Sequence, residues 1–404
     1  MTNNEIYAGF ASKNRVKAHS FMGVILKRTD IESLQKSIYS SLKDHADFIL
    51  HKLVVKDSNL GEDLPILNLE WEAQIEYKEQ ISTIYLSIGK TPNINIHQMV
   101  LDRGVSQMQI EESATHEYFL FSRQLYSSDP LISFSLQIKV LAAIADDVIL
   151  VLDFSSNRIF PSNWLEMARK SESLPSPRFL YLVNIINNRN EDGEIHYWLR
   201  TNGLYRCGSP ELEIINIKQN VEEVSHLLHA TANRFIQKSF SEKQVIPIGY
   251  DGLEMNVSWQ RWEDALEQYP NDAFGGMKYR NEDVKGYNKF RDPSGVLFAV
   301  EDGIFTSPEI YLNALKDGTL FYIDPNERRR QKSVSLERFS YFLNAYEEYG
   351  TKTFEDFPEI SYLSPTKSKY HWQFLVRLDM NITNDNDYRH MDELWFEVLE
   401  LHGD

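Results

Sequence analysis

Cys207 is the only cysteine of the 404-residue chain, and it directly follows Tyr205 and Arg206 in the segment 201–210. A neighbouring guanidinium favours the thiolate, which is the nucleophilic form of cysteine. A cysteine nucleophile also needs a base, and no histidine adjoins Cys207 in the sequence. Because free cysteines are typically buried and apolar, we expect Cys207 to be a buried, unreactive side chain.

Aromatic side chains gather in the segment 250–269, which contains Trp259 and Trp262. Such rings could line a groove that binds a peptide, or they could bury a large area where two domains meet. The mixed spacing of these aromatic residues favours the bridge between domains. The candidate binding surface of the chain consists of Trp259, Trp262, Arg206 and Tyr205.

The sequence offers few metal ligands at suitable spacing. His226 and His229 are three residues apart in a predicted helix, so both can face one side, but two ligands without a third rarely hold a metal. The segment 384–387 has the composition of a calcium loop without its glycine or its closing glutamate. We therefore predict no metal and no cofactor.

Motifs of the large enzyme classes are also absent. The chain has no G-x-x-x-x-G-K-[ST], no G-x-S-x-G, no H-E-x-x-H and no C-x-x-C. No glycine-rich turn follows the apolar run at 148–152, which argues against a dinucleotide-binding fold. We therefore assign no catalytic residue.

The charge of the chain excludes two kinds of partner. It has 42 lysines and arginines against 59 aspartates and glutamates, a net charge of −17. Phosphates and anionic lipids repel such a polyanion, so we predict that it binds neither nucleic acid nor a membrane. The start of the chain lacks the features of a secretory signal, and no apolar run is long enough to cross a bilayer. We therefore expect a cytoplasmic protein.

Apolar periodicity predicts an α+β fold with two similar units, each in the order strand, helix, three strands and helix. The first unit spans residues 1–128, with strands at 21–26, 67–72, 84–88 and 118–121. The second spans residues 129–245, with strands at 148–152, 179–186, 195–200 and 212–217. The first two units are expected to pack as one body, and a smaller α+β unit follows at 246–404.

The last predicted strand, at 394–401, is followed by a turn and by no returning strand. Native proteins usually cover such an edge. We therefore expect the last unit to be the opening part of a longer, truncated domain. In that case 394–401 pairs with 372–378 or with a partner chain.

Several segments resemble a bacterial family catalogued as domain of unknown function 4026. They are 129–153, 202–213, 262–266 and 296–299, and the segment through Cys207 is the most distinctive. The residues at 394–398 and 403–404 are similar to the start of a second family, domain of unknown function 2314, whose members continue further. Neither resemblance implies an activity.

Missing motifs and mixed sheets favour a non-enzymatic, cytoplasmic bacterial binding protein that acts through protein–protein contacts. One version is an immunity-type or stress-associated partner, an acidic protein that neutralises a basic toxin, because charge complementarity speeds that encounter. The alternative is a hydrolase. Its active site would form only on folding, from carboxylates and from histidines that are dispersed in the sequence, such as His196 or His226. A pocket with a histidine, a carboxylate and a shifted pKa would favour the enzyme, whereas an exposed apolar patch would favour the binder.

Overall fold

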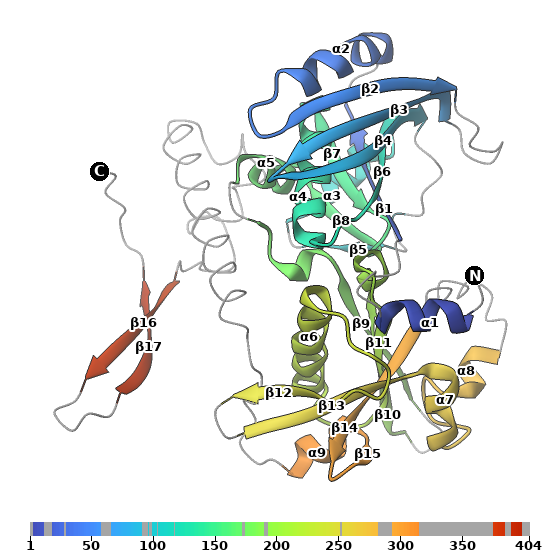
Figure 1. The fold of residues 1–404 in the computed structure, drawn as a ribbon, viewed down its shortest axis with the longest axis vertical. Coiled ribbons are helices and arrows are strands. Elements are labelled where there is room, and N and C mark those ends of the chain that lie inside the picture. The colour runs from blue at the N-terminus through green and yellow to red at the C-terminus, as the bar shows by residue number, and fades with distance from the viewer. Residues whose placement is uncertain are drawn as a thin grey trace. The chain divides into compact units, whose positions relative to one another are not determined.

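Two large mixed sheets with flanking helices are the main features of the protein in a computed structural model (Figure 1). The chain divides into two compact units, Met1–Arg338 and Phe339–Asp404, and both sheets belong to the first. The structure describes residues 3–11, 18–27, 30–57, 66–90, 96, 99–102, 104–116, 118–171, 174–189, 193–250, 253–281, 293–314, 375–383 and 389–397.

The first sheet has eight strands in the order β2-β3-β4-β6-β1-β7-β8-β5. Its strands are β1 (His19–Leu26), β2 (Ile49–Asp57), β3 (Ile66–Tyr77), β4 (Gln80–Lys90), β5 (Val100–Leu101), β6 (Tyr118–Leu125), β7 (Val148–Asp153) and β8 (Arg158–Pro161). All neighbours are antiparallel except β5 and β8. The helices of this part are α2 (Ile31–Lys43), α3 (Gln107–Ser113), α4 (Pro130–Ile144) and α5 (Ser162–Lys170).

Aspartate side chains cap the first turns of α2 and α4. The Asp30 side chain accepts a hydrogen bond from the Ser33 backbone at 3.0 Å, and Asp129 accepts from Leu131 and Ile132. Each cap satisfies backbone N–H groups that the first helical turn leaves without a partner. Both helices pack their apolar side chains into the main core.

The strand β7 is buried on both faces, as its continuous apolar sequence predicts. Val151 joins the main core with α2 and α4, whereas Leu150 and Leu152 join a smaller core under α3. We call the α3 side of the sheet its outer face. Farther along this face the strand β3 alternates buried and half-buried residues, so the sheet is only partly covered there.

The second sheet has the order β12-β13-β14-β11-β10-β9, with β15 on β14. Its strands are β9 (Leu182–Arg189), β10 (Ile195–Asn202), β11 (Glu211–Ile217), β12 (Ile246–Tyr250), β13 (Leu253–Arg261), β14 (Ser294–Glu301) and β15 (Ile304–Thr306). The strand β11 is parallel to β14, and the other neighbours are antiparallel. The helical segments are α1 (Asn3–Ala11), η2 (Pro177–Phe179), η3 (Leu204–Cys207), α6 (Val221–Gln237), α7 (Trp262–Ala265), η4 (Leu266–Gln268), α8 (Met277–Asn281) and α9 (Pro308–Ala314).

The α+β fold class with repeated units is confirmed. Both sheets contain a strand, a helix and three successive strands: β1-α2-β2-β3-β4 in the first and β11-α6-β12-β13-β14 in the second. The predicted boundaries near residues 128 and 245 do not follow the sheets. The strand β7 pairs with β1 in the first sheet, and β12 to β14 complete the second. Pairing between strands that are far apart in the sequence sets the boundaries of the sheets, and the local periodicity of apolar residues contains no information about this pairing.

The compact unit Phe339–Asp404 contains one antiparallel pair of strands in the part that the structure describes. These strands are β16 (Leu375–Thr383) and β17 (Arg389–Glu397). Leu378 lies opposite Leu394, so the predicted pairing of these two segments is confirmed where they are described. The described strand begins at Arg389, earlier than predicted. Residues 398–404, the predicted strand at 320–323 and the loop at 384–387 lie outside the described residues.

No helix among the described residues is both long and apolar enough to cross a membrane.

Candidate functional site

The turn between β10 and β11 carries Tyr205 and Arg206 and has a fixed shape. Gly203 has a φ of 116° and lies so close to the Leu180 carbonyl oxygen that a Cβ would approach it to 2.5 Å, so the turn requires glycine here. The Glu211 carboxylate accepts hydrogen bonds from the backbones of Gly203 at 2.8 Å and Tyr205 at 3.0 Å. It also accepts from the Thr201 hydroxyl at 2.7 Å.

Arg206 joins this turn to the first sheet through a buried ion pair with Asp153 at the end of β7. The guanidinium donates to both carboxylate oxygens, at 2.8 and 2.7 Å, and to the Leu180 carbonyl. Burial opposes the charge of Arg206, but the attraction of Asp153 outweighs it and raises the pKa of the guanidinium. Because two hydrogen bonds join the guanidinium and the carboxylate, they fix both the distance and the relative orientation of the two groups.

A cleft of about 470 Å³ opens beside this ion pair. Its lining comes from the start of β1, the turn between β7 and β8, and the turn between β10 and β11. The lining residues are Ala18, His19, Phe21, Phe154, Ser155, Asn157, Asn202, Gly203, Tyr205, Arg206 and Glu211. Residues far apart in the sequence therefore meet at one site, which has the size of a small-molecule or side-chain pocket.

A run of phenylalanines extends from the cleft along the outer face. Phe21 and Phe121 stack with ring centroids 5.9 Å apart, and Phe154 lies 6.1 Å from Phe121. Phe21 retains 37% of its surface in water. We call these three residues the aromatic patch. The sequence signal was weak, because each of the three residues reads as an ordinary strand or turn residue.

Trp259 does not belong to a binding surface, and its candidate role there is corrected. Its side chain has no exposed surface, and its indole N–H donates to the Phe240 carbonyl at 3.2 Å. Its ring lies 6.3 Å from Tyr7 of α1 and 6.5 Å from Phe235 of α6. Trp259 thus connects α1 and α6 within the main core.

Trp262 packs in a polar cluster around Arg280, which the sequence did not reveal. The Arg280 guanidinium lies 4.8 Å from the Trp262 ring and 5.1 Å from the Trp198 ring. Glu213 accepts from Arg280 at 2.5 Å and from the Trp198 indole at 2.9 Å. Burial opposes ionisation of Glu213, but Arg280 and Arg200 outweigh it and lower its pKa. Of the four candidate residues, only Tyr205 and Arg206 line the cleft.

The dispersed histidines are not brought to the cleft. His196 is hydrogen-bonded to Asn216 at 2.8 Å and lies in β10, whereas His226 and His229 lie in α6. His229 is hydrogen-bonded to Tyr181, and burial with nearby Arg178 lowers its pKa to about 4. In the described part of the chain no group of three histidines, cysteines or carboxylates could hold a metal ion.

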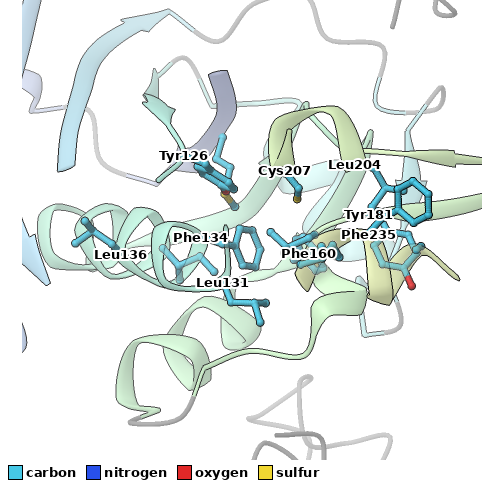
Figure 2. Close-up of a cluster of buried hydrophobic side chains, with 14 of the residues drawn as sticks. Tyr126, Leu131, Phe134, Leu136, Phe160, Tyr181, Leu204, Cys207 and Phe235 are labelled. Carbon is cyan, nitrogen blue, oxygen red and sulfur yellow. The ribbon is translucent and has the colours of Figure 1, made fainter. Parts of the chain in front are cut away.

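Cys207 is buried, as expected, with 2% of its surface exposed. Figure 2 shows it among side chains from distant parts of the chain, including Tyr126, Phe134 and Phe160.

We expect a thiol reagent to label Cys207 at least about a hundredfold more slowly in the folded protein than in denaturant, because reaction requires local opening. Ellman's reagent measures both rates, and the denatured sample supplies the control value of one thiol. Rapid, complete labelling of the folded protein would contradict this expectation.

Two family models match the chain. The model described as Protein of unknown function (DUF4026) N-terminal matches residues 20–175, and its C-terminal counterpart matches residues 183–298. The division between them falls between the two sheets. No curated protein and no solved structure matches the chain. The matches end before residue 375, so the similarity of the last residues to a second family stays a prediction. The two models together cover more than half of the sequence, and the chain therefore belongs to the DUF4026 family.

Proposed function

We propose that this chain is a non-enzymatic, cytoplasmic bacterial binding protein that acts by contact with another protein. The observation that carries this proposal is the aromatic patch, because Phe21 keeps 37% of its surface in water beside a cleft. Aromatic side chains at the centre of an interface typically supply much of the binding energy. An immunity-type or stress-associated role fits the acidic charge of the chain.

The outer face around the patch supports a protein partner. Arg123 pairs with Glu70 at 3.0 Å and lies 4.2 Å from the Tyr85 ring. These half-buried polar and aromatic side chains continue from the patch across β6 and β4. A broad face with an aromatic centre and a polar surround is the usual composition of a protein interface.

A hydrolase is the second candidate, because the cleft contains a histidine and a carboxylate. Burial and then the charge of Arg123 lower the pKa of His19. Against hydrolysis, the Glu211 oxygens already accept three hydrogen bonds. In the described part of the chain no hydroxyl is hydrogen-bonded to the His19 ring. A nucleophile and its base need such contact, so the arrangement favours binding.

Site-specific photocrosslinking in the native host tests the proposal. A benzoylphenylalanine replaces Phe21 in one variant and Tyr39, which is 51% exposed on α2, in the control. We expect a discrete protein adduct at position 21 and none at 39. The purified partner should bind the Phe21→Ala variant at least about tenfold more weakly and the Tyr39→Ala variant normally. Absence of an adduct at 21, or equal adducts at both positions, would refute the proposal.

A further inference from the structure

The charges that line the cleft are unequally balanced. Arg206 is neutralised by Asp153, and its other donors are directed at the Leu180 and Phe179 carbonyls and at the Ser20 hydroxyl. Glu211 is different, because its hydrogen bonds come from two backbone N–H groups and the Thr201 hydroxyl, which are all neutral. Among the described residues no cation forms an ion pair with Glu211. The wall of the cleft therefore carries one negative charge in excess.

Burial strengthens the effect of this charge. Glu211 has no exposed surface, so it acts through the wall of the cleft and not by direct contact. A charge in a region of low dielectric constant is screened less than one in water. The cleft is thus a more favourable place for a cation than for an anion.

The remaining lining also suits a cation. Phe21, Phe154 and Tyr205 supply aromatic rings, which attract cations at their faces. Asn202 also lines the cleft, and an asparagine amide carries a carbonyl oxygen that can accept a hydrogen bond from a cation.

From these observations we infer that the cleft binds a cationic side chain, arginine in preference to others, from a basic protein partner. The inference rests on the proposed function, since it names the group that the partner inserts beside the aromatic patch. A planar guanidinium can stack on an aromatic ring and donate to amide carbonyls at the same time, which an ammonium group does less well. The net charge of −17 adds long-range attraction for a basic partner.

Binding of blocked arginine tests the inference without knowledge of the partner. Chemical-shift titration of the full chain would compare N-acetylarginine amide with N-acetylcitrulline amide, which has a similar shape and no charge. We expect saturable binding of the arginine compound with an affinity at least about tenfold higher than that of citrulline. Equal affinities, or no binding of either compound, would overturn the inference.

Two variants localise the binding. Glu211→Gln keeps the shape of the side chain and removes its charge, so it should weaken arginine binding about tenfold and leave citrulline binding unchanged. Glu301→Gln, at an exposed position, is the control for net charge. If Glu211→Gln fails to fold, Phe21→Leu removes an exposed ring at the same cleft and should weaken arginine binding severalfold. Normal arginine affinity in the folded variants would overturn the inference, while a crosslink at position 21 would still support protein binding.

Discussion

Replacing Arg206 with methionine is expected to lower the free energy of unfolding of the compact unit Met1–Arg338 by about 3–5 kcal/mol. The substitution leaves the Asp153 carboxylate buried without its cationic partner. It also removes the donors to the Leu180 carbonyl. Because Asp153 ends a strand of the first sheet and Arg206 lies in a turn of the second, the loss also removes a link between the two sheets.

Guanidinium denaturation followed by circular dichroism measures this change. The double variant Arg206→Met with Asp153→Asn serves as the control, because it removes both charges. We expect the double variant to lose less stability than the sum of the two single variants, since no unpaired charge remains buried. Strict additivity, or a loss below about 1 kcal/mol in Arg206→Met, would show that the pair is not a stabilising contact of this size.

The second large effect is expected at Trp259, where substitution by alanine should cost about 3–5 kcal/mol. The indole has no exposed surface and contacts α1, α6 and the segment after α6 through Tyr7, Phe235 and Phe240. Its removal leaves a large cavity and an unpartnered Phe240 carbonyl, and each of these destabilises the fold.

Trp262→Ala is the matched control for this experiment, because it is the same substitution three residues away. Trp262 is half-buried at the surface of the second sheet, so the Trp262→Ala variant should lose clearly less stability than the Trp259→Ala variant. Denaturation curves of the two variants would check the ranking. A Trp262 variant as unstable as the Trp259 variant would contradict the assignment of Trp259 to the core.

Sequence patterns predicted the local elements because local chemistry determines them. Asp129 and Pro130 start a helix in any context that permits one, since the cap satisfies backbone groups of the same turn. The apolar run at 148–152 predicted a strand buried on both faces, and β7 is such a strand. The burial of Cys207 followed from the general behaviour of free cysteine.

The candidate site was predicted only in part. Tyr205 and Arg206 were chosen from one distinctive segment, and both line the cleft. Phe21, Phe154 and Asp153 were missed as site residues, because nothing local distinguishes them from ordinary strand and turn residues. Trp259 was misplaced, since spacing alone does not show which face of a strand is covered.

The sequence by itself determined the α+β class, the position of many strands, the acidic charge and the burial of the single cysteine. These properties depend on composition and on contacts between residues close in the chain. The tertiary structure alone decided that β7 joins β1, that Arg206 meets Asp153 and that the start of β1 and two distant turns line one cleft. Pairing between distant strands depends on the packing of the whole core, and a single sequence contains no local signal for it.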